Sequence, residues 1–306
     1  SGVKLAMNIV NTSTRRTIEP HSVATAPVLS HWLGEVIDSD PLFKGDCRLD
    51  ILREHAGLIM DRDGPLGGEI AAIWRESVED KLAEGEAAVP FNALMAVEAD
   101  GRPFIDPWVS RSGDMEWHDR LIHVALLPVW RLHIAHGIAT EAHGQSMVLV
   151  HRDGWPERLI LRDFHDSLEF VPGFLADPAL APDFETLNPD YRDAQPNQYY
   201  WMQRPEDLRD LFVDCVFVFS LSEISHLAQS FYGIDELTFW QRVARQLSAY
   251  ITEHDLGARA SRLGFGTREI LTESLLARKL GLNGPDFQHE VPNALAGLSL
   301  LARENA

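Results

Sequence analysis

Apolar and polar residues alternate with period two near the start of the chain, and this pattern predicts a strand over residues 3–12. Apolar residues then recur at helical spacing in residues 27–37 and again in residues 68–82, so both segments are predicted to be helices. A third helix is predicted over residues 117–135. For residues 90–99 the periodicity does not decide between a strand and a short helix.

The clearest local signal is a hairpin. Two short apolar segments, residues 147–151 and 159–163, are separated by a loop that contains an Asp-Gly pair, which favours a turn. The loop is predicted to be longer than two residues, which leaves the register open. Pairing of these strands places Asp163 across from Ser146 and Met147. The polar groups gathered at the open end of the hairpin are Glu141, His143 and Asp163.

Residues 171–206 are rich in Pro, Asp and Asn and are typical of a long loop or a connection between domains. The pattern beyond them is helical, and a last helix is predicted over residues 268–280. The sequence therefore predicts an α+β protein. A mixed or antiparallel sheet region over residues 1–170 is followed by a mainly helical region over residues 171–306.

Composition narrows the classes of function. The 306 residues are 45% hydrophobic and 24% charged, as in soluble globular proteins with a sizeable core. The net charge of −19 argues against nucleic-acid or anionic membrane partners, although a local arginine cluster can still bind phosphate. No stretch of eighteen apolar residues occurs and no signal peptide is visible, so neither a transmembrane helix nor secretion is expected.

The cysteine content bears on the cellular compartment of the protein. The two cysteines, Cys47 and Cys215, show neither metal-ligand spacing nor a disulfide framework, which favours a reducing cytoplasm. The histidines include no HExxH pair, so a zinc site is not expected. The segments containing Asp153 and Asp163 superficially resemble protein-kinase motifs, but the asparagine that a kinase needs five residues after its aspartate is Arg158 here.

Two constellations suit nucleotide chemistry. The carboxylates of Glu141 and Asp163 are hard oxygen ligands that suit Mg²⁺ held together with phosphates, with His143 beside them. A structural salt-bridge cluster at the base of a hairpin would place the same residue types together. Hydroxyl and guanidinium groups in residues 12–16 suit phosphate binding, although spacing alone favours a helix cap or a loop with a solvated charge pair.

These segments resemble a known family, the NRPS-independent siderophore synthetases of the IucA/IucC family. Residues 137–150 (GIATEAHGQSMVLV) and 158–166 (RLILRDFHD) are similar to its GIxxEAHxQN…RDF signature. Weaker similarities, in family order, lie in residues 4–16, 72–79 and 275–295, the second of them resembling an internal helix. Family members are about twice this length. The resemblance thus covers the "fingers" and "palm" of a hand-shaped fold, and the N-terminal "thumb" is expected to be absent.

The resemblance implies siderophore biosynthesis by an ATP-dependent, AMP-forming ligase. Such enzymes activate citrate or a related carboxylic acid as an acyl-adenylate and release pyrophosphate. An amine, hydroxylamine or alcohol then attacks. The implied cofactors are ATP and Mg²⁺, and the implied partners are the small acid and an amine or hydroxamate substrate. A homodimer in the cytoplasm is a further expectation.

Carried over residue by residue, the resemblance assigns Mg²⁺ to Glu141 and Asp163, and catalysis to His143 and Arg16. The residues expected to contact the nucleotide or the acid are Ser13, Thr14, Arg16, Arg75, His143, Ser146 and Arg162. Two positions depart from the family pattern: Ser146 replaces Asn, and Ala294 replaces Pro. The alternatives left open are an ATP-dependent phosphotransferase and a non-catalytic module that binds a nucleotide or a siderophore precursor.

Overall fold

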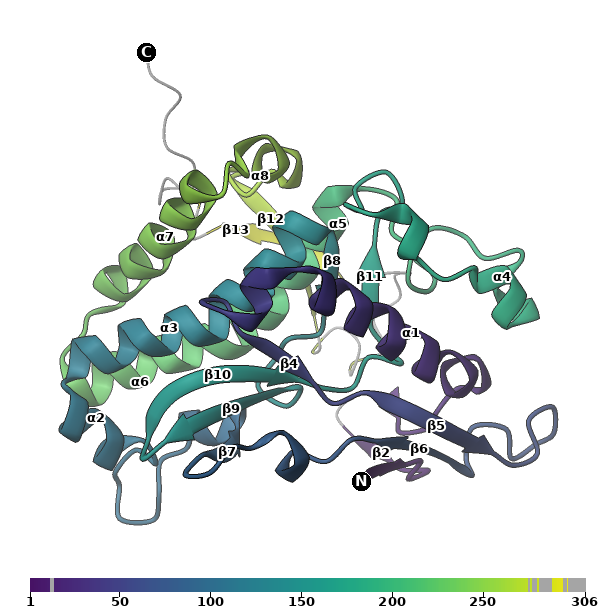
Figure 1. Cartoon of the computed structure of the whole chain (residues 1–306), viewed down its shortest axis with the longest axis horizontal. Coiled ribbons are helices and arrows are strands. Elements are labelled where there is room, and N and C mark those ends of the chain that lie inside the picture. Colours follow the sequence, from purple (N-terminus) through teal and green to yellow (C-terminus); the bar gives the residue numbers. More distant parts are fainter. Residues whose placement is uncertain (12–13, 275, 277–279, 281–287, 294–295, 297–306) are drawn as a thin grey trace.

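The computed structural model describes residues 1–11, 14–274, 276, 280, 288–293 and 296, and it has the predicted α+β architecture. Twisted sheets line one side of the molecule, and long helices cover them (Figure 1). One large apolar core joins helices from both parts of the chain, so that Trp130 packs against Phe212 across the predicted boundary at residue 170. That boundary remains a prediction.

A four-stranded sheet with the order β4-β10-β9-β7 contains the predicted hairpin. Its strands are β4 (Leu49–Ile51), β7 (Ala87–Pro90), β9 (Met147–Arg152) and β10 (Trp155–Leu161). Strand β10 is antiparallel to β9 and parallel to β4. The sheet is therefore mixed, as the sequence predicted.

The turn of this hairpin is tighter than predicted. Arg152 pairs with Trp155, so the loop is the two residues Asp153 and Gly154, with φ of 50° and 88°. Positive φ at both positions is typical of the primed turns that suit the twist of a hairpin. The prediction of a longer loop was wrong because it overlooked that Trp155 and Pro156 continue the ladder.

A three-stranded sheet with the order β1-β6-β5 lies beside the first sheet. Its strands are β1 (Gly2–Leu5), β5 (Glu54–Ile59) and β6 (Ala71–Arg75). Helix α1 (Pro20–Ser39) packs on one face of it, where Ile73 meets Val23 and Ala26. The approach is so close that a Cβ on Gly57 would lie 2.7 Å from Val23 Cγ1.

The helix predicted over residues 68–82 is wrong. Residues 71–75 form β6, the central strand between β1 and β5, and only a 3₁₀ turn, η2 (Glu79–Lys81), follows it. The apolar run Ala-Ala-Ile-Trp is compatible with the spacing of a helix and with that of a strand. The segment is a strand because β1 and β5 form hydrogen bonds with it on its two sides.

The helical elements of the first part of the chain agree better with the sequence. Helix α1 contains the predicted residues 27–37, and α3 (Asp114–Arg131) continues as a π-helix, η4 (Leu132–His136), over the predicted 117–135. In the undecided segment 90–99 a 3₁₀ helix forms. The remaining helices of this part are η1 (Pro41–Lys44), η3 (Phe91–Met95) and α2 (Asp106–Ser112).

Residues 171–206 are mostly loop, as predicted, with three short turns of helix: η5 (Pro178–Leu180), α4 (Phe184–Leu187) and η6 (Pro189–Tyr191). The predicted helical region follows. Its elements are α5 (Pro205–Phe212), a π-helix η7 (Val213–Leu221), α6 (Ser222–Tyr232), α7 (Glu236–Glu253) and α8 (Gly257–Leu263).

By length and composition alone, the continuous helical run from Pro205 to Tyr232 is long and apolar enough to cross a membrane. However, 61% of its most apolar window is buried inside the protein, where its α5 part packs against β8 and its α6 part packs against α7. Burial of this kind is typical of a central core helix.

Four short strands complete the pairing near the site. Strands β2 (Val10–Asn11) and β3 (Thr14–Arg15) pair with each other, and β8 (Ile138–Thr140) pairs with β11 (Leu168–Phe170).

The helix predicted over residues 268–280 is wrong in its first half. There β12 (Glu269–Glu273) pairs with β13 (Gln288–Pro292). Most of its second half, and Ala294, lie outside the described residues.

Candidate active site

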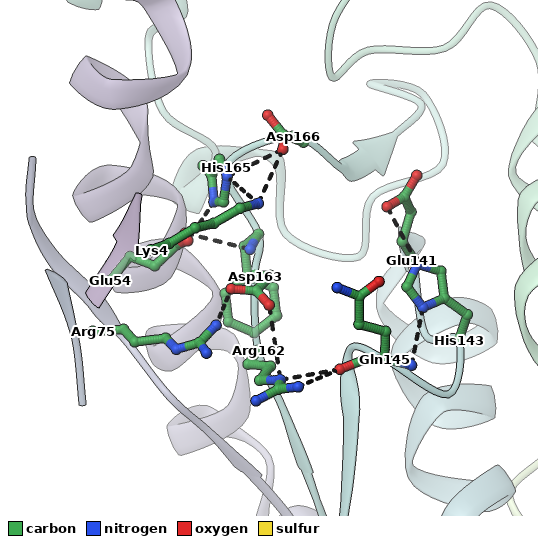
Figure 2. Close-up of polar contacts among 11 residues, drawn as sticks. Lys4, Glu54, Arg75, Glu141, His143, Gln145, Arg162, Asp163, His165 and Asp166 are labelled. Atoms are coloured by element: carbon green, nitrogen blue, oxygen red, sulfur yellow. Dashed lines mark hydrogen bonds and ion pairs between the residues drawn. The ribbon is translucent and has the colours of Figure 1, made fainter. Parts of the chain in front are cut away.

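Three strand ends meet at one place and bring together polar side chains from distant parts of the sequence. Arg75 ends β6, Arg162 and Asp163 follow β10 directly, and Glu141 follows β8. The segment from His143 to Ser146 then leads into β9. Figure 2 shows Arg75 and Asp163 on one side, Glu141 and His143 on the other, and Gln145 between them.

Asp163 is held by two arginines. Arg75 donates a hydrogen bond to its Oδ1, and Arg162 Nε lies 3.8 Å from its Oδ2. Asp163 has a φ of +67°, a left-handed conformation that is uncommon for residues other than glycine and that Asp and Asn tolerate best. Unusual backbone of this kind is often found at functional positions.

The two guanidinium groups share one carboxylate, so the cluster keeps a positive charge. Burial and the neighbouring Arg75 lower the pKa of Arg162, and Asp163 opposes this effect. The side chains of Arg75 and Arg162 are about one-fifth exposed, at 17% and 21%. A partly exposed arginine pair with surplus charge suits a phosphate or carboxylate ligand.

A chain of contacts links this cluster to the histidine. Arg162 donates from Nε and Nη2 to the carbonyl oxygen of Gln145, at 3.0 and 2.7 Å. The backbone N–H of Gln145 donates to His143 Nδ1 at 3.3 Å. In the neutral ring the proton therefore resides on Nε2, which lies 3.7 Å from Glu141 Oε2. His143 thus presents a donor beside a carboxylate.

The backbone of Ser146 forms hydrogen bonds with both His143 and Arg162. Its N–H donates to the carbonyl of His143 at 2.9 Å, and its own carbonyl accepts from Arg162 N–H at 3.1 Å. Leu161 pairs with Met147 and Arg162 lies across from Ser146, so Asp163 lies one residue beyond the region that the hairpin prediction gave. Ser146 is 6% exposed.

The predicted phosphate-binding residues of the N-terminal segment are placed only in part. Arg16 is exposed beyond β3, and its backbone bonds Met7 and Ile9 at 2.9 and 2.8 Å. Thr14 is described by its backbone in β3, and Ser13 lies outside the described residues. Their roles remain predictions.

The chemistry of the two carboxylates is compatible with Mg²⁺. No group of three or more His, Cys, Asp or Glu side chains in the described part of the chain is arranged to hold a metal by itself. Magnesium, however, usually takes only one or two carboxylates and completes its shell with phosphates and water. Glu141 and Asp163 each retain oxygen lone pairs for that purpose.

A second polar cluster lies directly behind Asp163, and the sequence did not indicate it. The His165 side chain is fully buried and contacts Glu54 through Nδ1, while Asp166 Oδ2 lies 3.1 Å from Nε2. Lys4 reaches the same Asp166 oxygen at 3.3 Å, and its Nζ lies 2.8 Å from Nε2 (Figure 2). The Glu54 carboxylate also accepts from the N–H of Phe164 at 3.3 Å.

This cluster fixes the loop that carries Asp163. Burial opposes protonation of His165, but Asp166 and Glu54 outweigh burial and raise the pKa of His165 to about 9. His165 and Lys4 in turn hold the pKa of Asp166 well below its usual range, against burial. The only signal in the sequence was the His-Asp pair after the Arg-Asp-Phe motif, since Lys4 and Glu54 come from distant strands.

Comparison with known proteins shows what this arrangement is similar to. The petrobactin biosynthesis protein AsbB of Bacillus anthracis superposes on 97% of this chain with a TM-score of 0.93 and 38% identity, over 50% of its own length. The aerobactin synthetase IucC of Klebsiella pneumoniae gives a TM-score of 0.75 at 24% identity, again over 97% of this chain and 50% of its own length, which supports the fold alone. The fold is that of the siderophore synthetases.

The chain belongs to the IucA/IucC family of siderophore synthetases. The IucA/IucC family model matches residues 1–96, and a model described as "Ferric iron reductase FhuF-like transporter" matches residues 115–293. A citryl-spermidine/3,4-dihydroxybenzoyl-citryl-spermidine:spermidine ligase of B. anthracis is 38% identical over 96% of this chain and 48% of its own length. A Staphylococcus aureus synthase is 32% identical over 81% of this chain and 41% of its own length.

The chain spans about half the length of the curated relatives it matches. The sequence contains two cysteines. Both cysteines are buried and free.

Proposed function

We propose that this chain provides the nucleotide-binding site of an AMP-forming synthetase in siderophore biosynthesis. The enzyme would activate a carboxyl group of citrate or a related acid with ATP and join it to an amine, hydroxylamine or alcohol. The observation that carries the proposal is the continuous network from Arg75 through Asp163, Arg162 and the Gln145 backbone to His143.

The network has the properties that adenylation requires. Negative charge grows on the α-phosphate and on the departing pyrophosphate, so fixed donors that meet this charge lower the barrier. Arg75 and Arg162 would bind the phosphates or the acid, and the Nε2–H of His143 would donate to the α-phosphate. The Gln145 backbone holds both Arg162 and His143 in place, which keeps their separation constant.

The proposal includes Mg²⁺ held by Glu141 and Asp163 together with the nucleotide phosphates. When bound, the ion would neutralise phosphate charge. Arg16, Thr14 and Ser13 are proposed to contact phosphates from the β2–β3 hairpin, in line with the family resemblance. An ATP-bound structure of the Klebsiella relative IucA, at 16% identity and a TM-score of 0.73, shows ATP binding for that protein.

The proposal extends to the cellular setting of the protein. Two free, buried cysteines and the acidic composition suit a cytoplasmic enzyme. The homodimer remains a prediction, as does the assignment of this chain to the fingers and palm regions. The residue boundary between fingers and palm at 170 is part of the same proposal.

The test is product analysis on the full-length protein. With ATP, Mg²⁺ and a panel of citrate, succinate derivatives and 2-oxoglutarate, we expect AMP and pyrophosphate only with the correct acid, and hydroxylamine should trap the activated acyl group as a hydroxamate. Formation of ADP and phosphate would instead establish a phosphotransferase. ATP binding without any turnover across the panel would favour the non-catalytic module.

A further inference from the structure

The β1-β6-β5 sheet presents charged side chains to the loop of residues 163–166, which carries Asp163 (Figure 2). Arg75, at the end of β6, pairs across the strands with Glu54, at the start of β5. Residues that pair directly in neighbouring strands project from the same face of a sheet. Arg75 donates to the carboxylate of Asp163, and the carboxylate of Glu54 accepts from the N–H of Phe164 at 3.3 Å. One cross-strand pair of the sheet therefore contacts two successive residues of the loop.

A β-bulge sets the direction of Glu54. The pairing of β5 with β6 changes register between Glu54 and Ala56, which leaves His55 as the extra residue. Beyond the bulge, Gly57 lies on the face that packs closely against α1. Strict alternation from Gly57 would place Glu54 on the opposite face. The bulge instead puts Glu54 on the α1 face, where only 1% of the residue is exposed. Bulges that redirect a side chain in this way are common beside active sites.

Two further contacts hold the third residue of the loop, His165. The carboxylate of Glu54 contacts its Nδ1, and neither side chain of this pair has exposed surface. Separating a buried ion pair leaves uncompensated charge, so the pair disfavours loop conformations that move His165 away from Glu54. The buried Tyr200 donates from its hydroxyl to the carbonyl of His165 at 2.8 Å. The loop is therefore held through both its backbone and a side chain.

Asp163 needs this support because its own backbone conformation is unfavourable. Its φ of +67° lies in the left-handed region, which few residues other than glycine adopt. Such a conformation persists only where the surrounding structure determines it. The contacts of Phe164 and His165, the next two residues, supply that determination. Loss of these contacts would let the loop relax and would move the Asp163 carboxylate.

We propose that Glu54 and Tyr200 are positioning residues, which hold the Asp163 carboxylate where it can bind Mg²⁺ together with the nucleotide phosphates. Both are buried and act through Phe164 and His165. The inference rests on the proposed function, since it takes Asp163 as a ligand of Mg²⁺. Replacing a residue that orients a metal ligand typically weakens metal affinity about 10- to 100-fold. Loss of Glu54 should therefore weaken the part of nucleotide binding that depends on Mg²⁺.

The experiment is titration calorimetry of the full-length protein with ATP as the probe, once with Mg²⁺ and once with EDTA. We expect Glu54→Gln to weaken ATP binding with Mg²⁺ about tenfold or more and to leave ATP binding with EDTA unchanged. A general loss of structure would weaken both. Hydrogen exchange of the Phe164 amide should also become faster in Glu54→Gln, because a neutral amide oxygen is a weaker acceptor than a carboxylate.

The matched control is Glu76→Gln. Glu76 likewise accepts from a backbone N–H, that of Arg53 at 2.9 Å, and pairs with a cation, Lys81, at 2.8 Å, but neither contact involves the loop. ATP binding with Mg²⁺ should be unchanged in this control. Tyr200→Phe is the second test variant, because it removes one hydrogen bond to the loop and no buried charge. We expect Tyr200→Phe to weaken ATP binding with Mg²⁺ about two- to tenfold, and it decides the matter if Glu54→Gln does not fold.

Wild-type affinity for ATP with Mg²⁺ in both Glu54→Gln and Tyr200→Phe would overturn the inference, as would an equal loss of affinity with Mg²⁺ and with EDTA. Failure of the proposed function gives a different result. A wild type that binds no ATP would remove the proposed function and this inference together. A wild type that binds ATP with Mg²⁺ but releases no pyrophosphate with any acid would remove adenylation, and the two variants would still test the positioning of Asp163.

Discussion

Asp163 forms an ion pair with Arg75, a residue 88 positions earlier in the chain, and it does so from a left-handed backbone conformation. The pair joins the end of β10 to the end of β6, and hence one sheet to the other. Neither strand is a local neighbour of the other in sequence. The position of Asp163 therefore depends on the tertiary structure, and so does the charge that would face the proposed nucleotide.

Replacing Asp163 with Asn tests its part in adenylation. The substitution removes the negative charge but keeps a side chain that tolerates the positive φ, so the backbone should be preserved. We expect pyrophosphate release to fall by about 10²–10³ while the protein remains folded, as circular dichroism would show. The control is Asp153→Asn, at the other positive-φ aspartate of this hairpin, and normal turnover in Asp163→Asn would remove Asp163 from the mechanism.

Truncation of His143 tests its proposed role as a hydrogen-bond donor to the α-phosphate. The change to Ala removes Nε2–H and leaves the Gln145 N–H without its acceptor. We expect kcat/KM for ATP to fall about 10- to 100-fold, the effect of one hydrogen bond to a charged group. His31→Ala, at an exposed position on α1, serves as the control. A wild-type rate in His143→Ala would leave that residue a structural role only.

Stability should depend on pH through His165. Its pKa of about 9 in the folded protein exceeds the ordinary value of 6.5, so its contribution is complete below pH 6.5 and is lost as pH rises through about 9. At 1.36 kcal/mol per unit, this contribution is of the order of 3 kcal/mol.

Urea unfolding at pH 6.5 and pH 9 measures this difference. The free energy of unfolding should fall across that interval in the wild type and stay nearly level in His165→Gln. The same slope in both proteins would mean that another group is responsible.

The hairpin turn should not accept a side chain at Gly154. A Cβ there would lie 2.2 Å from Trp108 Cγ and Cδ1, and the φ of +88° disfavours any residue but glycine. We expect Gly154→Ala to lower the free energy of unfolding by about 1–3 kcal/mol. Gly173→Ala is the matched control, because its Cβ would meet nothing within 4 Å. Equal stability of the two variants would contradict this reading of the turn.

Much of the fold could be predicted from the sequence where the deciding interactions are local. The β9–β10 hairpin follows from alternating apolar residues around an Asp-Gly pair, and α1 and α3 follow from apolar residues at helical spacing. The convergence of Asp163 with the segment before β9 follows from the same hairpin. These elements carry their own signals because the residues that pair or pack are near each other in sequence.

The remainder was decided by distant partners. Residues 71–75 became a strand, not a helix, because β1 and β5 pair with it on both sides, and β12 formed because β13 lies beside it. Lys4 and Glu54 joined His165 from strands more than 100 residues away. Periodicity reports which face of an element is apolar, but hydrogen bonding between strands and the sharing of buried charge depend on the whole fold.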